Sequence, residues 1–111
     1  DYYLNHSFFA NFIKGMYKNE AKEYAKNRLG AWGWEGQFDS LDKLWTKESD
    51  WNYKAKNKSG AAGIPQLKGG SNVPNFDTDY RVQVDHGLSY IKNRYGSPNN
   101  AWGAFQKKGW Y

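Results

Sequence analysis

Residues 38–51 read FDSLDKLWTKESDW, and this stretch decides how the chain is interpreted. Its spacing predicts a helix that begins at Asp39 or Ser40, both capable caps, and runs to about Ser49. The apolar stripe of that helix consists of Phe38, Leu41 and Trp45. Glu48 lies three residues beyond the last of them and continues the stripe. The pattern therefore places a carboxyl group at the end of an apolar helix face, beside a tryptophan.

The surroundings of Glu48 admit two interpretations. If the end of the helix is packed, the carboxyl group is partly removed from water, and desolvation raises its pKa. A carboxyl group with a raised pKa suits a general acid that works near neutral pH. If the end of the helix reaches solvent, Glu48 is an ordinary surface carboxylate. Asp50 lies about 200° further around the helix, so it faces away from Glu48.

Apolar spacing predicts three further helices. The first begins after Ser7, a good N-cap, and runs to about Leu29. The next spans about residues 79–95 and stops at a glycine. The last begins with Ser97 as its cap and Pro98 at its first helical position.

The segment between the middle helices, residues 51–78, is rich in Gly, Lys, Asn and Ser. It is too long for a plain connector in so small a domain, so we expect it to be functional, flexible or a short sheet. Strands do not alternate with helices as a parallel sheet requires. The predicted class is mainly α, a small single helical domain with a short loop or β element after the helix that carries Glu48.

The composition bounds the class of protein. With 111 residues, the chain has room for one compact domain. It contains six Trp, nine Tyr and six Phe, so rings replace much of an aliphatic core. The absence of cysteine excludes disulfides and zinc–thiolate sites. A mean hydropathy of −1.00 excludes a membrane span. Without a signal-peptide pattern, we expect a domain of a longer exported protein, or one delivered by another route.

The basic charge points to anionic partners. The net charge is +5 and the isoelectric point is about 9.3. The first helix carries a lysine every fourth residue, and three more follow after residue 51: Lys14, Lys18, Lys22, Lys26, Lys54, Lys56 and Lys58. Nucleic acid, anionic wall polymers or simple solvation would each explain them. The two histidines, His6 and His86, lack metal-ligand spacing, and we expect neither a metal nor a cofactor.

The helix over residues 79–95 carries a row beside its apolar stripe. The members of this row are Gln83, Gly87, Tyr90 and Arg94. Gly87 lowers helix stability and removes a side chain, so something approaches closely there. A packed core residue and a ligand are equally consistent with that position.

Several motifs in this chain occur in a fixed order. They are Glu48-Ser49, Trp51, Ala55, residues 60–66 (GAAGIPQ), residues 83–91 (QVDHGLSYI), residues 94–98 (RYGSP) and residues 109–111 (GWY). Together they resemble the lysozyme-like lytic transglycosylases, in the superfamily of soluble lytic transglycosylases and goose-type lysozymes. Within it they are similar to Gram-positive and phage members near the resuscitation-promoting factors. In this chain Asn57 stands where many members have Ser, and Pro65 replaces the usual Met.

The resemblance implies an activity and a set of site residues. It implies cleavage of the β-1,4 bond between N-acetylmuramic acid and N-acetylglucosamine in peptidoglycan, giving 1,6-anhydro ends. Glu48 is then the catalytic acid and afterwards the base. The residues that bind or orient substrate are Ser49, Trp51, Gln66, Tyr90 and Trp110.

The resemblance also sets a domain boundary and a location. It covers about residues 25–111, and residues 1–24 are interpreted as an N-terminal helical extension or linker. We expect a monomeric domain of a larger protein, either extracellular, associated with the cell wall or carried on a phage particle. Its expected partners are peptidoglycan glycan strands, and anionic wall polymers are a second candidate. Nucleic acid and membranes are not expected partners.

Three competing functions stay open. The first is a muramidase that uses water and a second carboxylate, for which the candidates are Glu20, Glu35 and Asp77. The second is a wall-binding module without catalytic activity. The third is a basic protein that binds nucleic acid, whose affinity would depend strongly on salt.

Overall fold

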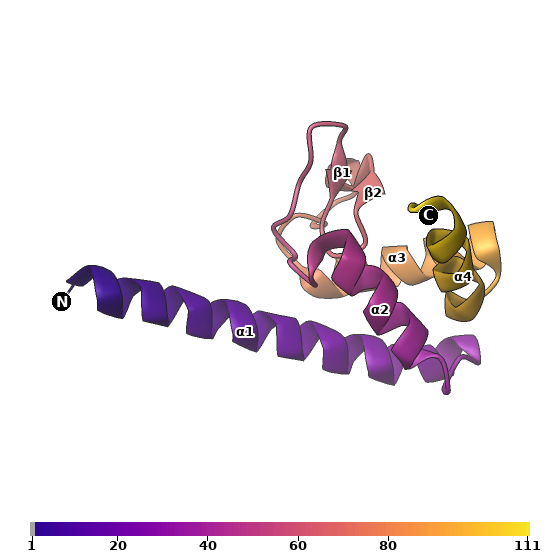
Figure 1. Cartoon of the computed structure of the whole chain (residues 1–111), viewed down its shortest axis with the longest axis horizontal. Helices are drawn as coiled ribbons and strands as arrows, with labels where there is room; N and C mark the ends of the chain where they lie inside the picture. Colours follow the sequence, from indigo (N-terminus) through magenta and orange to yellow (C-terminus); the bar gives the residue numbers. More distant parts are fainter. Residues whose placement is uncertain (1) are drawn as a thin grey trace.

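The computed structural model describes the backbone of residues 2–111 and the side chains from residue 9 onward. Helices make up 64% of the chain and strands 5% (Figure 1), so the prediction of a mainly α domain with a small β element is confirmed. The elements in chain order are α1 (Tyr2–Arg28), η1 (Leu29–Trp32), α2 (Phe38–Ser49), β1 (Ala61–Ala62), β2 (Leu67–Lys68), η2 (Gly70–Asn72), α3 (Tyr80–Tyr95) and α4 (Pro98–Lys108).

The predicted N-caps of two helices, Ser7 for α1 and Asp39 or Ser40 for α2, are wrong. The first helix begins at Tyr2, so Ser7 lies inside it and does not cap it. In α2, Gln37 occupies the N-cap position, and its side chain makes no capping hydrogen bond. A preceding turn, closed by the Gln37 amide on the Trp34 carbonyl at 2.9 Å, brings the chain directly into helical geometry. Asp39 therefore lies in the first turn of α2, where it pairs with Lys43.

The predicted start of α4 is confirmed and that of α3 lies within one residue. Asp79 is the N-cap of α3 and accepts a hydrogen bond from the Arg81 amide at 2.9 Å. Ser97 caps α4, where its hydroxyl accepts from the Asn100 amide at 3.2 Å, and Pro98 follows at the first helical position. Local sequence decides these two starts because a short polar side chain satisfies an amide that the helix leaves unpaired.

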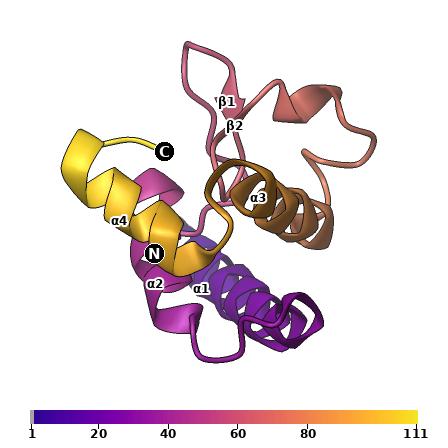
Figure 2. The same cartoon turned by 90° about the vertical axis from the view of Figure 1, so that its right-hand side faces the viewer.

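The core lies where the C-terminal half of α1 packs against α2 and α3, and α4 packs on those two helices. Figures 1 and 2 show α2, α3 and α4 gathered over that half of α1. The largest fully buried side chains are Trp45, Trp51, Phe76, Leu29, Leu41, Leu44, Ile64, Leu88 and Ile91. Three large rings among them confirm that aromatic side chains replace part of an aliphatic core.

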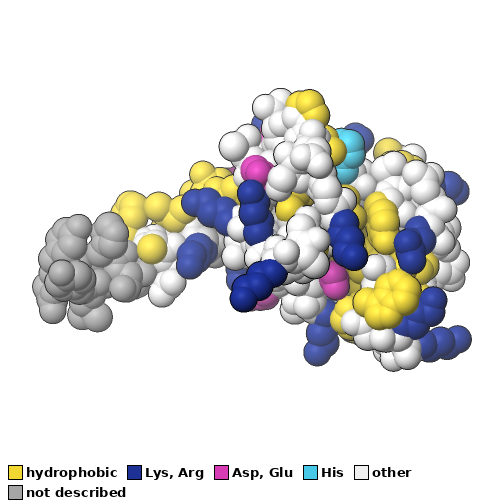
Figure 3. Space-filling view, turned by 90° about the horizontal axis from the view of Figure 1, so that it is seen from above, with side chains coloured by type: hydrophobic (Ala, Val, Ile, Leu, Met, Phe, Trp, Pro, Cys, Tyr) yellow, Lys and Arg dark blue, Asp and Glu magenta, His cyan; other side chains and the backbone are white. Residues whose placement is uncertain are grey.

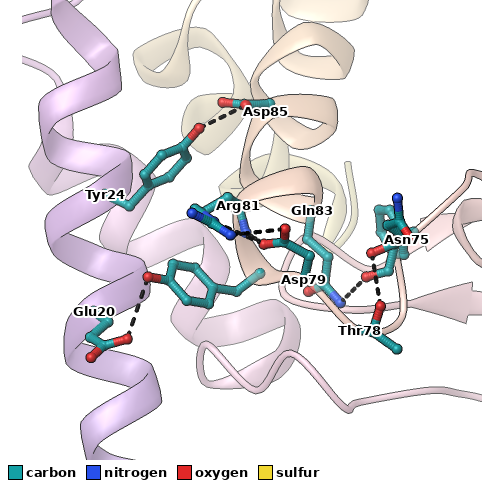
Figure 4. A network of polar contacts seen from close by, with 10 residues as sticks. Glu20, Tyr24, Asn75, Thr78, Asp79, Arg81, Gln83 and Asp85 are labelled. Atoms are coloured by element: carbon teal, nitrogen blue, oxygen red, sulfur yellow. Dashed lines mark hydrogen bonds and ion pairs between the residues drawn. The ribbon is translucent and has the colours of Figure 1, made fainter.

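Polar contacts join α1 to α3 at the edge of this core. The Tyr24 hydroxyl donates to Asp85 at 2.8 Å (Figure 4). Arg28 pairs with the same carboxylate at 3.0 Å. Tyr80 lies edge-on to Tyr24, and its hydroxyl donates to Glu20 at 3.4 Å. These contacts fix the orientation of α3, which carries part of the site described below.

The N-terminal half of α1 projects away from the packed domain (Figure 1). Its apolar stripe is exposed, with Phe9 at 63% and Phe12 at 60%. Ala21 and Ala25 are buried in the core. The boundary expected between residues 24 and 25 therefore falls inside one continuous helix, and the packed part already includes Ala21.

The segment between α2 and α3 contains a short antiparallel hairpin. Ala61 pairs with Lys68 and Ala62 pairs with Leu67. Asn57 holds the approach to the hairpin, because its side-chain oxygen accepts from the amide of Ala61 at 3.0 Å. The expectation of a short sheet in this segment is confirmed, and the hairpin forms one side of the cleft described below.

Gly87 is the point where α3 passes closest to α2. A Cβ added there would lie 2.6 Å from a ring carbon of Trp45 and 3.0 Å from the Cβ of Pro65. Both neighbours are buried, so Gly87 is a packing glycine. We expect Gly87→Ala to lower the free energy of unfolding by about 1–3 kcal/mol through overpacking, as measured by urea denaturation.

Gly103 provides the matched control for this substitution. It also lies inside a helix, α4, but no atom lies within 4 Å of an added Cβ. Gly103→Ala should leave stability unchanged or raise it by up to about 1 kcal/mol, because Ala has the better helix propensity. Equal stabilities for the two variants would show that α3 has room at Gly87.

Candidate active site

A cleft of about 650 Å³ opens between the hairpin, the end of α2 and the C-terminal part of the chain. The polar and aromatic side chains that line it include Glu48, Asn57, Gln66, Tyr90, Arg94, Trp110 and Tyr111. Figure 3 views the molecule from above and shows basic and hydrophobic side chains side by side on the globular part. The cleft thus combines one acid, two basic residues (Arg94 and Lys68) and several rings.

Glu48 is half-buried in the last turn of α2, and its side chain faces this cleft. Leu41 and Trp45 on the same stripe are fully buried, so the apolar face leads directly to the carboxyl group. Burial raises the pKa of Glu48 above its ordinary value of 4.5. Of the two interpretations left open above, the partly desolvated carboxyl group is the one that the structure supports.

The last residue of the chain anchors the cleft beside Glu48. The Tyr111 hydroxyl accepts from the Trp45 indole N–H at 3.0 Å and donates to the Pro65 carbonyl at 2.8 Å. Burial raises the pKa of Tyr111 well above 10, so the hydroxyl stays neutral and remains a donor. One phenol therefore connects the helix of Glu48 to the loop before the second strand.

Tyr90 and Gln66 line the cleft, as expected for residues near Glu48. Burial raises the pKa of Tyr90, and the nearby charge of Arg94 opposes that shift. The side-chain nitrogen of Gln66 donates to the carbonyls of Ala55 at 3.1 Å and Gly63 at 2.9 Å. The Gln66 amide thus holds its own loop together at the edge of the cleft.

Trp110 lies at the mouth of the cleft and is half-exposed. Its ring has the basic groups of Arg94 and Lys108 over it, at 5.6 Å and 4.9 Å from the ring centroid. Among the aromatic residues expected to stack on a sugar, Trp110 is the one with an accessible ring.

Trp51 does not line the cleft, and the expectation that it stacks on substrate is wrong. The side chain is 1% exposed and packs edge-on to Trp45 with ring centroids 5.2 Å apart. Its indole N–H donates to Asp42 at 2.9 Å. The backbone at Asp50 and Trp51 is left-handed, with φ of 53° and 57°, and this reversal directs the ring under α2.

Ser49 does not line the cleft but lies at a second groove that Asp50, Trp51 and Tyr53 also line. Its hydroxyl donates to the Ile64 carbonyl at 2.7 Å. Ser49 therefore fixes the loop that carries Gln66, and it is a positioning residue with no place among the residues that line the cleft.

Gln83 ties the segment between α2 and α3 to α3 (Figure 4). It is fully buried, and its amide oxygen accepts from the Ile64 amide at 2.8 Å. Its amide nitrogen donates to the carbonyls of Tyr53 and Phe76, each at 2.8 Å. One side chain thus holds three points of a long segment that forms a wall of the cleft.

The other carboxylates considered as catalytic partners lie outside the cleft. Glu20 and Glu35 are exposed on α1 and after η1. Asp77 accepts a hydrogen bond from Ser71 and pairs with Lys56 at 3.0 Å. Both contacts lower the pKa of Asp77, that of Ser71 the more. Among the side chains of residues 9–111, Glu48 is the one carboxyl group that lines the cleft. The same residues contain no cluster of three acidic, His or Cys groups suited to a metal.

Arg94 and Tyr111 are among the lining residues that the sequence-based interpretation did not assign to the site. Arg94 was placed in a row with Tyr90, and that four-residue spacing was the available signal, because it puts both on one face of α3. Tyr111 gave no such signal, since the residues it contacts lie 46 and 66 positions earlier in the chain.

Comparisons with protein-family models, curated proteins and solved structures found no match to this chain. Within residues 2–111, no helix is both long enough and apolar enough to cross a bilayer.

Proposed function

We propose that this chain is a lytic transglycosylase of the lysozyme-like superfamily that cleaves the β-1,4 bond between N-acetylmuramic acid and N-acetylglucosamine in peptidoglycan. The observation that carries the proposal is Glu48, a half-buried carboxyl group with a raised pKa in a cleft that no other described acidic side chain lines. The order of motifs from Glu48 to Tyr111 supports the same family.

The mechanism needs one carboxyl group. Protonated Glu48 gives its proton to the glycosidic oxygen as the bond to the anomeric carbon breaks, and the acetamido group of the substrate stabilises the positive centre. The Glu48 carboxylate then takes the proton from the 6-hydroxyl of the muramic residue, whose oxygen attacks the anomeric carbon. The products are a 1,6-anhydro end and a free 4-hydroxyl, and no water is consumed.

The surroundings of Glu48 suit both of its roles. Partial burial favours the protonated form before the bond breaks. Tyr90 and Gln66 lie along the same cleft, where they can orient the sugar, and Trp110 offers a ring at its mouth. A hydrolysing glycosidase uses a second carboxylate to activate water or to form a glycosyl-enzyme. Glu20, Glu35 and Asp77, the candidates for that second group, lie outside the cleft.

Mass spectrometry of the soluble products from purified Gram-positive sacculi tests this proposal. We expect muropeptides that end in anhydromuramic acid and are lighter by one water than hydrolysis products. Products with free reducing ends would instead identify a muramidase. Binding to sacculi without any soluble product over a long incubation would identify a wall-binding module.

A further inference from the structure

Arg94 is a basic residue held in the wall of the cleft by aromatic rings. Its guanidinium carbon lies 5.9 Å from the ring centroid of Tyr90, 5.8 Å from that of Tyr95 and 5.6 Å from that of Trp110. Contacts of this kind stabilise a cation over the faces of the rings. Arg94 is therefore positioned by its neighbours, although it is exposed to solvent.

Arg94 forms no ion pair with any side chain that the structure describes. Among residues 9–111, the ion pairs within 4.0 Å involve other basic residues. Glu48 lines the same cleft, but it forms no ion pair with Arg94 within 4.0 Å. The side chain of Lys68 adds a second positive charge to the cleft lining.

The cluster around Arg94 also leaves a hydroxyl group unsatisfied. Among the described side chains, the Tyr95 hydroxyl is the buried polar atom that has no hydrogen-bond partner. Tyr95 stacks on Tyr111, with ring centroids 6.0 Å apart, and lies edge-on to Tyr90. Tyr95 is not among the residues that line the cleft, so it supports the cluster around Arg94 from within the protein.

The guanidinium group is planar, and its N–H groups can bind both oxygens of a carboxylate at once. We propose that Arg94 is a specificity-determining residue that binds a carboxylate carried by the glycan strand. The cleft would then prefer anionic peptidoglycan strands to neutral polymers of N-acetylglucosamine. This inference rests on the proposed function, because it takes the cleft as the glycan site. The carboxylate comes either from the lactyl group of a peptide-free strand or from the stem peptide.

Binding titrations of an inactive background separate these possibilities. Each variant is made together with Glu48→Gln, so that no strand is cleaved during the measurement. The probes are a neutral hexamer of N-acetylglucosamine, peptide-free glycan strands and strands with intact stem peptides. Arg94→Gln removes the cation, and Lys92→Gln is the control, since it removes the same charge from an exposed position of α3 outside the cleft.

We expect Arg94→Gln to weaken binding of at least one carboxylate-bearing probe about tenfold, as for the loss of a charge-assisted hydrogen bond. Binding of the neutral hexamer should change less than twofold, and Lys92→Gln should change none of the three. A loss confined to the peptide-bearing strands assigns the carboxylate to the stem, and a loss with peptide-free strands assigns it to the lactyl group.

An equal loss for the neutral hexamer and the anionic strands would overturn the inference, because Arg94 would then act only on the shape of the cleft. Unchanged binding of all three probes would overturn it as well. The proposed reaction fails separately, through the absence of anhydro products from the unmodified chain. Near-ultraviolet circular dichroism checks that Arg94→Gln keeps the packing of the rings around it.

Discussion

Glu48→Gln is expected to lower the rate of anhydromuropeptide release by about a thousandfold while the fold is retained. The amide has nearly the same shape as the carboxylic acid, but it can neither give a proton to the glycosidic oxygen nor accept one from the 6-hydroxyl. General acid–base catalysis contributes about 10²- to 10⁴-fold, and here one group performs both transfers. Product release from sacculi, followed by mass spectrometry, gives the rate.

Asp50→Asn is the matched control for this variant. It makes the same change from acid to amide two residues further along, at an exposed side chain that pairs with Lys18 at 2.7 Å. Because Asp50 lies outside the cleft, the Asp50→Asn variant should release anhydromuropeptides at a rate within about twofold of that of the unmodified chain. If Glu48→Gln cleaved sacculi at the unmodified rate, Glu48 would not be the acid and the proposed mechanism would be wrong.

The raised pKa of Glu48 gives the same variant a second, independent readout. Because burial raises this pKa in the folded state, the folded chain binds the proton more tightly than the unfolded chain does. That contribution to stability is complete below the ordinary pKa of 4.5 and is lost as the pH rises through the raised value. The Glu48→Gln variant does not lose stability in this way, because the glutamine side chain does not ionise. Urea unfolding should therefore show the variant gaining stability relative to the unmodified chain as the pH rises from about 4.5.

The features that could be predicted from sequence are those set by neighbours within one or two turns. The period of the helix placed Glu48 on the same stripe as Trp45, but it left open whether the carboxyl group is packed or exposed, which the structure decides. Ser97 was predicted correctly as a helix cap for a similar reason, because a cap depends on residues next to it. The start of α2 escaped prediction because backbone turns bring the chain into that helix, with no capping side chain.

The features that could not be predicted depend on the backbone direction or on distant residues. Two successive left-handed residues, at positions 50 and 51, turn the Trp51 ring into the core, and non-glycine residues rarely adopt this conformation. Tyr111 joins Trp45 to Pro65 across most of the chain, and local periodicity carries no information on such a contact. Of the residues that the resemblance implies for the site, Ser49 and Trp51 do not line the cleft, because packing decides which side chains face it.

Gly63 shows why the wall of the cleft depends on a residue outside it. The backbone at Gly63 is left-handed, with φ of 76°, and an added Cβ would lie 2.6 Å from the amide oxygen of Gln83. The loop that follows, through Ile64 to Gln66, therefore lies directly on that amide. Because the hairpin has only two residues in each strand, its own ladder contributes little to holding the loop in place.

Gln83→Met is expected to have the largest effect on stability of any single substitution considered for this chain. Methionine has a similar length but makes no comparable hydrogen bonds, so the Ile64 amide and the Tyr53 and Phe76 carbonyls lose their partner. Each unsatisfied buried group costs about 1–3 kcal/mol, so three of them cost about 3–9 kcal/mol. A domain of this kind is stable by about 5–15 kcal/mol, so urea unfolding followed by tryptophan fluorescence should show a large shift of the midpoint.

The pattern of hydrogen exchange distinguishes this mechanism from a general loss of packing. In Gln83→Met the Ile64 amide should exchange much faster, while core amides of α1 and α3 should follow the lower global stability. Gln106→Met makes the same chemical change at an exposed position of α4 and should alter stability by no more than about 0.5 kcal/mol. A Gln83→Met variant as stable as Gln106→Met would mean that the three backbone groups find other partners. Gln83 would then not be what holds the wall of the cleft.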